Sequence, residues 1–208
     1  MSKVETLLFT GGEIHDYKGC GEEILGWLDR DGRFEISCVE NDLDIFASRE
    51  LERYNLIVFY YTVGEITDEQ FNGLSRFVKS GKGFTAIHSG ADSFRDCPEF
   101  RSMVGGWFVT HPHYRSYMVS ILDRQSPITE GLEEFTVTDE QYITDYDPRN
   151  HILATALWQG KPQPAAWTRQ WGKGKIFYLA LGHDRPACQN ENFGKLLCQG
   201  AHWAAERD

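Results

Sequence analysis

A six-residue apolar run, LIVFYY at residues 56–61, constrains the fold more than any other feature of this sequence. Its aliphatic, β-branched and aromatic residues follow one another without a polar interruption, which is typical of a strand covered on both faces. A helix is predicted next, because Thr67 and Gln70 have the spacing of a capping box and Gly81 stands where a helix would end. A second strand, FTAI at 84–87, completes the unit. Two strands joined by a helix favour a parallel sheet with a right-handed crossover.

The remaining segments extend this unit in two different ways. The first half adds a strand at 4–9, a helix at 17–30 and a strand at 34–39. The second half has little helix between its strands, so we expect antiparallel additions there, at 116–122, 134–138, 152–157, 164–168 and 175–181, before a closing helix at 192–204. These elements predict a flavodoxin-like, doubly wound α/β fold with a mostly parallel sheet and antiparallel additions in the second half. The adjacent parallel strands should be 4–9, 56–61, 84–87 and 176–181. No repeat, low-complexity tract or linker interrupts residues 1–208, which predicts a single domain.

Charge and cysteine content narrow the class of partner. The chain of 208 residues has a formal net charge of −10, and its basic residues are scattered singly. Because phosphate neutralisation needs clustered Lys and Arg, nucleic acids and anionic membranes are disfavoured. Five widely spaced cysteines without a CxxC pair argue against a disulfide framework or a zinc ribbon. No apolar run approaches the roughly 20 residues that cross a bilayer, and the N-terminus lacks a signal-peptide pattern. We expect a cytoplasmic protein with a small-molecule partner; its oligomeric state, a homo-oligomer included, is left open.

Three of the seven histidines come just after predicted strands. His15, His88 and His183 follow the first, third and last strands of the proposed parallel set. In an open parallel sheet, ligands bind beyond the carboxyl ends of the strands, so we expect these side chains to face one site. Each also has a structural interpretation. His15 would cap the following helix, His183 would bond a backbone carbonyl, and His88 would belong to a tight turn.

A predicted loop and an acidic turn add further polar side chains. The loop at 105–113, GGWFVTHPH, contains His111 and His113, which point the same way if the chain is extended there. A His-x-His pair can bind a metal, although two ligands do not make a site. Asp139 and Glu140 form the only carboxylate pair that we place near the same edge of the sheet. The structural alternatives are a surface loop and a solvated acidic turn.

An ordered series of motifs along the chain resembles a known family. The motifs are HDY (15–17), AIHSGADSF (86–94), GGWFVTHP (105–112), SPITEGLEEF (126–135), DEQY (139–142), PAAW (164–167), GKGKIFYLALGHD (172–184) and GKLLCQGAHWAAE (194–206). In this order they resemble the ThuA-like (trehalose-utilisation) family, whose fold is similar to that of class I glutamine amidotransferases. The resemblance implies a role in carbohydrate metabolism, with trehalose, a related disaccharide or an oxidised keto derivative as substrate.

The resemblance also suggests a role for His88. In amidotransferases of this fold a cysteine occupies the strand-to-helix turn and a histidine follows a late strand. His88 looks like the replacement of that cysteine, and His183 looks like the partner histidine. Because a thiolate nucleophile is then missing, glutaminase activity is disfavoured, and Ser89 is a poor substitute since it lies off the tip of the turn. We expect strain at His88 with Gly90 allowing close approach of the backbone, and we expect neither His88 nor His183 to belong to core packing.

Two chemistries then suit the histidines. For proton transfer at neutral pH, the predicted catalytic residues are His88, His183, Glu140 and Asp184. For metal binding, the predicted ligands of zinc or another divalent metal, with one position left open, are His15, His88, His111 and His183. Substrate contacts are predicted at Gly12, Tyr61, Ser89, Trp107 and Tyr142. The alternative function is a non-catalytic sugar-binding protein on the same fold.

Overall fold

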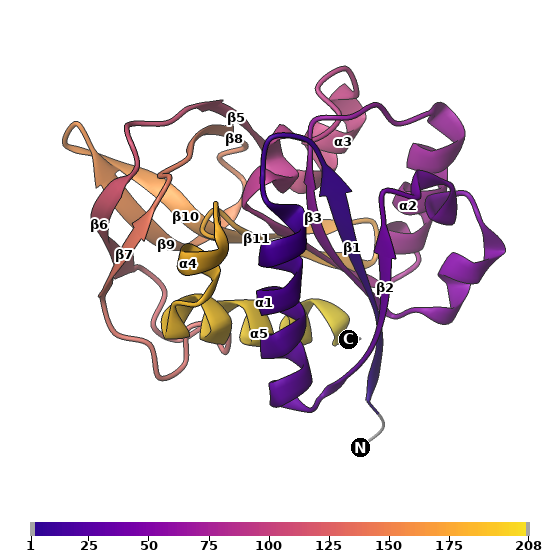
Figure 1. The fold of residues 1–208 in the computed structure, drawn as a ribbon, viewed down its shortest axis with the longest axis horizontal. Coiled ribbons are helices and arrows are strands. Elements are labelled where there is room, and N and C mark those ends of the chain that lie inside the picture. The colour runs from indigo at the N-terminus through magenta and orange to yellow at the C-terminus, as the bar shows by residue number, and fades with distance from the viewer. Residues whose placement is uncertain (1–2, 207–208) are drawn as a thin grey trace.

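A nine-stranded mixed sheet forms the centre of the protein (Figure 1), which a computed structural model describes over residues 3–206. The strand order is β2-β1-β3-β4-β11-β10-β9-β6-β7. Its parallel part consists of β1 (Val4–Gly12), β2 (Phe34–Glu40), β3 (Leu56–Thr62), β4 (Gly83–Ile87) and β11 (Gly174–Leu179). The four strands predicted to be adjacent and parallel are therefore neighbours, and the expected fold class is confirmed.

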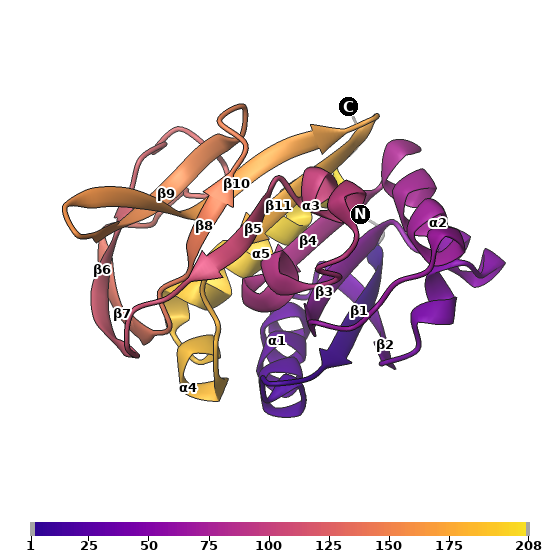
Figure 2. The ribbon, with the colours of Figure 1, turned by 90° about the horizontal axis from the view of Figure 1, so that it is seen from above.

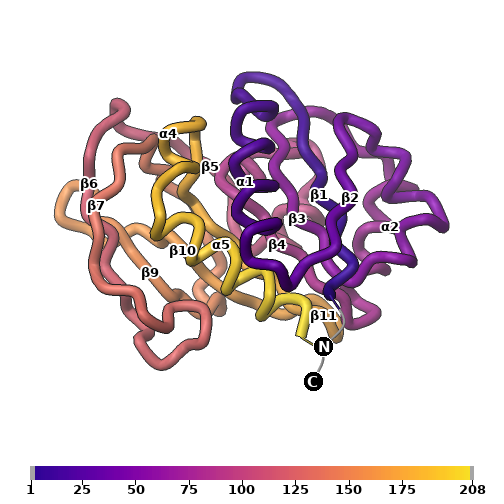
Figure 3. Tube along the Cα trace, turned by 60° about the horizontal axis from the view of Figure 1, so that its bottom comes forward, coloured from indigo at the N-terminus to yellow at the C-terminus, as the bar shows by residue number. Residues whose placement is uncertain are grey.

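Helices cover both faces of the parallel strands. On one face lie α1 (Tyr17–Asp31) and α5 (Glu191–Ala205), which Figure 3 shows beside each other. The other face carries α2 (Asp68–Lys79), α3 (Pro98–Val104) and the 3-10 helices η1 (Leu43–Phe46) and η2 (Arg49–Arg53). Every residue of β3 is buried, as its unbroken apolar run predicts. Its side chains alternate between the two cores, so that Tyr60 packs on the α1 side and Tyr61 on the α2 side.

The predicted capping box begins α2. The hydroxyl of Thr67 accepts a hydrogen bond from the backbone N–H of Gln70, and the side-chain carbonyl of Gln70 accepts one from the N–H of Thr67. These two bonds satisfy donors that the first turn of a helix otherwise leaves free. The helix ends at Lys79, and Gly81 follows it with a φ of 106°, a conformation that favours glycine.

Antiparallel strands continue the sheet beyond β11. They are β10 (Lys161–Trp171), β9 (His151–Trp158), β6 (Arg115–Ile121) and β7 (Phe135–Asp139). Each overlaps a strand predicted from the sequence. The short helix α4 (Arg185–Cys188) then connects the sheet to α5. No helix among residues 3–206 is long and apolar enough to cross a membrane.

The prediction of a loop at 105–113 is wrong in part. Its first half forms β5 (Gly106–Thr110), which pairs antiparallel with β8 (Ile143–Tyr146) in a separate two-stranded sheet. The sequence gives no local signal for this pairing, because the two strands lie more than thirty residues apart and each is very short. The expectation of one domain over residues 1–208 stays a prediction.

Candidate functional site

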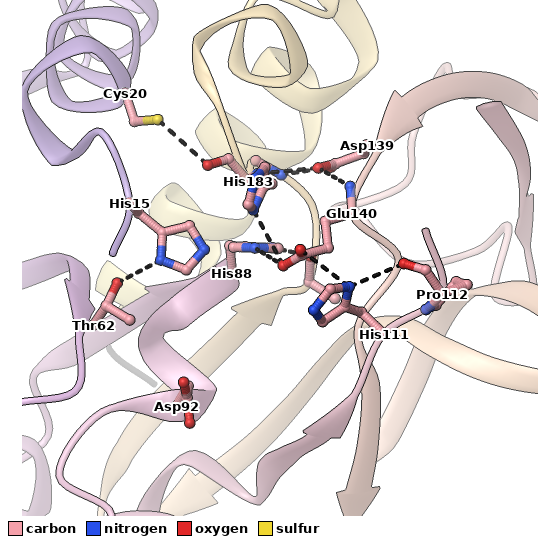
Figure 4. A network of polar contacts seen from close by, with 12 residues as sticks. His15, Cys20, Thr62, His88, Asp92, His111, Pro112, Asp139, Glu140 and His183 are labelled. Atoms are coloured by element: carbon pink, nitrogen blue, oxygen red, sulfur yellow. Dashed lines mark hydrogen bonds and ion pairs between the residues drawn. The ribbon is translucent and has the colours of Figure 1, made fainter. Parts of the chain in front are cut away.

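The carboxyl ends of three parallel strands bring three histidines together, as predicted. His15 lies beyond β1, His88 follows β4 directly, and His183 lies beyond β11 (Figure 4). The ring centroid of His15 is 5.1 Å from that of His88 and 4.9 Å from that of His183, and the latter two are 5.4 Å apart. The parallel register of β1, β3, β4 and β11 produces this convergence, because it places all four carboxyl ends at one edge.

His88 occupies a strained turn between β4 and the 3-10 helix η3 (His88–Asp92). Its φ is 43°, a left-handed conformation that costs a residue other than glycine of order 1 kcal/mol. At Gly90, an added Cβ would come within 3.0 Å of the Cβ of Ala86, so the turn packs closely on the strand below it. The expected nucleophile-type turn is therefore present, with an imidazole at its tip.

The expectation that His88 takes no part in core packing is wrong. Its side chain is completely buried, and the ring of Tyr142 lies over it at a centroid distance of 3.8 Å. The Nδ1 atom lies 2.8 Å from the carbonyl oxygen of Ala180. Because a carbonyl can only accept, Nδ1 must carry the hydrogen, and in the neutral ring the lone pair is on Nε2. The backbone turn orients the imidazole ring of His88, and this ring fills the space below the site.

Glu140, just after β7, contacts two of the three histidines. Its Oε2 lies 3.2 Å from Nδ1 of His183 and 3.7 Å from Nε2 of His88. Burial opposes ionisation of this carboxyl, but its contacts with the rings of His183 and then His88 outweigh burial, so its pKa lies well below the usual range. For His183, burial disfavours the charged form, yet the bond and charge of Glu140 raise its pKa above the ordinary value. Ionisation of Glu140 and protonation of His183 therefore favour each other.

Asp139 places this pair and was not predicted as a site residue. It is fully buried, and its carboxylate accepts hydrogen bonds from the backbone N–H groups of Gly182, His183 and Glu140, at 2.8, 3.1 and 2.7 Å. Burial is the main cause that raises the pKa of this carboxyl, with the three N–H donors acting against it. Asp139 therefore ties the loop after β11 to the end of β7. The DEQY motif drew attention to the neighbouring Glu140, but nothing in the sequence distinguished which carboxylate faces the histidines.

His15 is held by a residue that sequence reasoning also missed. Its Nδ1 lies 2.8 Å from the hydroxyl oxygen of Thr62 at the end of β3. Burial, followed by the nearby rings of His88 and His183, lowers the pKa of His15 to about 3. The ring is therefore neutral at physiological pH. Thr62 follows the LIVFYY run directly, and its place at a strand end was the signal available for it.

Four of these side chains fit a metal ion. His15, His88, Glu140 and His183 each offer one ligand atom, and these atoms lie within 4.8 Å of one another. Three ring nitrogens, His15 Nε2, His88 Nε2 and His183 Nδ1, are buried without a well-aligned hydrogen-bond partner. Nitrogen lone pairs together with one carboxylate oxygen are a ligand set that zinc accepts. The bonds that His15 and His88 make through their other nitrogens are the outer contacts that usually orient such ligands.

Two predicted site residues have a different position from the expected one. His111 contacts Glu140, with 3.1 Å between its Nδ1 and Oε1, but it lies on the open side with 42% of its side chain exposed and is not one of the four clustered ligands. Asp184 caps α4, where its carboxylate accepts a hydrogen bond from the N–H of Ala187 at 2.9 Å. In place of the predicted His15, His88, His111 and His183 set, the compact group contains Glu140.

The residues predicted to contact substrate divide into two groups. Tyr142 stacks on His88, and Ser89 is buried next to it with its hydroxyl unpartnered. Gly12 lies where an added Cβ would come within 2.2 Å of the backbone oxygen of Thr62, so it brings the turn after β1 close to β3. The structure does not bring the other two to the cluster. Tyr61 packs among Phe9, Phe59 and Phe94, and Trp107 lies on the outer side of β5.

Fold and site together define an α/β protein of the amidotransferase-like class in which a histidine occupies the strand-to-helix turn. The profile of the ThuA family, described as trehalose utilisation, matches residues 5–204. The chain therefore belongs to the ThuA family.

Solved structures share the fold at low sequence identity. A ThuA-like protein from Parabacteroides merdae superposes with a TM-score of 0.86 at 23% identity, covering 98% of this chain and 90% of that one. A cytoplasmic protein from Salmonella typhimurium LT2 gives a TM-score of 0.69 at 16% identity, and the match covers 97% of this chain and 100% of that one. A β-galactosidase from Bacillus circulans sp. alkalophilus gives 0.65 at 15% identity; the match covers 98% of this chain but 31% of the galactosidase. No curated protein matches the sequence.

Proposed function

We propose that this protein is an enzyme of carbohydrate metabolism that acts on a disaccharide or a keto sugar. The reaction would take place at the histidine–glutamate cluster, formed by His15, His88, Glu140 and His183, by proton transfer or with the help of a divalent metal. Membership of the trehalose-utilisation family supports the substrate class. One observation carries the proposed chemistry: three imidazole nitrogens and a carboxylate lie within 4.8 Å of one another, and two of those nitrogens, on His15 and His88, are buried without a hydrogen-bond partner. Buried polar atoms without partners are costly, so a protein that keeps several of them together uses them.

In this proposal, two groups beside Glu140 have opposite proton roles. His183 donates a proton to an oxygen of the sugar from the ring nitrogen that does not face Glu140, because Glu140 stabilises its imidazolium form. His88 offers the lone pair of Nε2 as the base, since its Nδ1 hydrogen is fixed on Ala180. With 28% of its side chain exposed, His183 is accessible to a ligand from solvent, whereas His88 is fully buried beneath.

Zinc or another divalent metal would be held by His15, His88, Glu140 and His183. When bound there, the ion would supply a Lewis acid that polarises a sugar oxygen and acidifies a water molecule. The low pKa of His15 suits this role, because only the neutral ring offers a lone pair.

Glutamine hydrolysis is not part of the proposal. The tip of the turn carries His88, and neutral imidazole is a poor nucleophile toward an amide. The hydroxyl of Ser89 next to it is fully buried. The remaining elements of the proposal are a small carbohydrate as the partner, without nucleic acid or membrane, in the cytoplasm.

Metal analysis of tag-free protein combined with turnover assays tests this function. The protein would be incubated with trehalose, related disaccharides and their keto derivatives, before and after chelation. Loss of turnover on chelation, restored by zinc, supports the metal-assisted reaction; turnover by metal-free protein supports proton transfer alone. Glu140→Gln should reduce turnover in either case, and the matched control His113→Asn, an exposed residue outside the cluster, should not. Binding of these sugars without turnover under any condition would favour the non-catalytic sugar-binding protein instead.

A further inference from the structure

A second hollow lies between α3 and the β5–β8 pair, away from the histidine–glutamate cluster. Figure 2 shows these three elements next to one another, with β8 beside β10. The hollow has a volume of about 450 Å³, within the range of small-molecule sites. The side chains that matter for its chemistry are Arg101, Trp107, Tyr146, Arg149, Arg169 and Trp171. None of them belongs to the cluster described above.

Alternation along β5 separates the two sites. Phe108 points toward the cluster, where its ring lies 4.5 Å from that of Tyr142 and 5.8 Å from that of His111. Neighbouring side chains of a strand point to opposite faces, so Trp107 points the other way, into the second hollow. Trp107 was predicted to contact substrate, and its position shows that any ligand it touches here is bound apart from His88.

Arg169 is the positive group at the base of this hollow. Its side chain is 13% exposed, one of its amino groups donates to the side-chain oxygen of Asn150 at 3.0 Å, and its buried Nε has no partner. The nearest carboxylate, Asp147, is 3.5 Å away and is already held by Arg149 at 2.6 Å. Burial, the larger cause, and the charge of Arg149 act against the charged form and lower the pKa of Arg169. A largely buried guanidinium that shares its one carboxylate partner with a second arginine favours the approach of an anion.

Aromatic rings supply a second kind of contact in the same hollow. Trp107 and Tyr146 are 38% and 36% exposed, so part of each ring is open to a ligand from solvent. The guanidinium of Arg101 lies over the indole of Trp107 at 5.8 Å, so cation and ring face the same space. Trp171 is held in place by a hydrogen bond from its indole N–H to Ser75 at 2.9 Å. The lining of the hollow has three arginines and two carboxylates, which is a local positive excess in a chain of net charge −10.

We propose that this hollow binds an anionic carbohydrate: a sugar ring lies on Trp107 and Tyr146, and its phosphate or carboxylate group binds the guanidinium of Arg169. Aromatic faces pack on the apolar face of a sugar ring, and the planar fork of arginine matches either anion. The hollow is a binding site distinct from the histidine–glutamate cluster and goes beyond the function proposed above. A ligand there would be recognised by charge as well as by ring, whereas neutral trehalose lacks the charged group.

Calorimetric titration of the full chain at low salt tests this proposal with four probes: glucose, glucose 6-phosphate, glucuronate and inorganic phosphate. We expect one or both anionic sugars to bind roughly tenfold more tightly than glucose or inorganic phosphate, because an added charge-assisted contact is worth about that factor. Glucose 6-phosphate as the tighter ligand would identify a phosphate site, and glucuronate a carboxylate site. Binding should weaken as salt is added.

Variants locate the binding in the hollow. Trp107→Ala and Arg169→Gln should each weaken binding roughly tenfold, while Trp107→Phe, which keeps a ring, should weaken it less. Arg124→Gln is the matched control, since it removes the same charge from a surface ion pair with Glu133. If Arg169→Gln fails to fold, the result with Trp107→Ala tests the proposal alone, because Trp107 is partly exposed and its removal should not prevent folding. His183→Ala should leave this binding unchanged, which separates the hollow from the proposed enzyme site.

Three outcomes would overturn the proposal: absence of binding by both anionic sugars, equal affinity for glucose, or equal affinity for inorganic phosphate. Binding that survives Trp107→Ala unchanged would place the ligand elsewhere and would overturn it as well.

Discussion

Protonation of His15 is expected to destabilise the metal-free protein as the pH falls. Burial and two neighbouring imidazoles lower the pKa of this ring in the folded state from 6.5 to about 3. The unfolded chain therefore binds more protons at this residue between pH 6.5 and pH 3, and by linkage the free energy of unfolding decreases as the pH falls through that window. Above pH 6.5 the ring is neutral in both states and has no such effect.

The size of this effect follows from the pKa difference. When the unfolded chain is protonated at this residue and the folded chain is not, the free energy of unfolding falls by about 1.4 kcal/mol for each pH unit. A fall from pH 6.5 to pH 4.5 therefore lowers it by at most about 2.7 kcal/mol. The ring keeps partial contact with solvent, which screens the interaction, and we therefore expect about 1–2 kcal/mol.

The substitution His15→Asn isolates this contribution, because asparagine does not titrate and is still able to bond Thr62. Urea unfolding of chelator-treated protein at pH 7.5 and pH 4.5 gives the free energy of unfolding for the wild type, His15→Asn and the control His113→Asn. Between pH 7.5 and pH 4.5 the free energy of unfolding of His15→Asn should fall by about 1–2 kcal/mol less than that of the wild type, by the same linkage argument. The control should follow the wild type. If all three proteins lose the same free energy, the electrostatic description of the cluster is wrong.

Three further predictions concern the turn, the helices and the missing nucleophile. At His88, where φ is 43°, the His88→Gly variant should be more stable than His88→Ala by about 1 kcal/mol in urea unfolding, and equal stability would show that the turn is not strained. Gly73→Ala should lower the melting temperature by several degrees, since its Cβ would lie 1.9 Å from the carbonyl oxygen of Phe46. Gly26→Ala in α1 is the matched helical control and should leave the melting temperature unchanged. Similar melting temperatures for the two variants would contradict the prediction. An electrophilic glutamine analogue should leave the protein unlabelled in mass spectrometry, and a covalent adduct at Ser89 or at a cysteine would restore the glutaminase interpretation.

The positions of the parallel strands and the convergence of the histidines were predictable from the sequence for a physical reason. Buried parallel strands have unbroken apolar runs, and the parallel arrangement alone places the residues that follow them at one edge. His15, His88 and His183 needed no knowledge of side-chain packing to be grouped.

Contacts made across long sequence separations were not predictable in the same way. The position of Glu140 among the histidines depends on how the antiparallel strands close against β11, and the three N–H bonds of Asp139 depend on the same geometry. The outward direction of Trp107 depends on the pairing of β5 with β8. Complete burial of His88 results from Tyr142, which reaches it from a segment more than fifty residues away.

Turnover by His183→Ala compared with His113→Ala tests the central claim most directly. His183 is proposed to donate the proton and to hold a metal, while His113 lies exposed outside the cluster. With whichever disaccharide or keto sugar the wild type converts, His183→Ala should lose a factor of about 10² or more in kcat with its melting temperature little changed, and His113→Ala should retain the wild-type rate. Equal rates for the two variants would contradict the assignment of the histidine–glutamate cluster as the catalytic site.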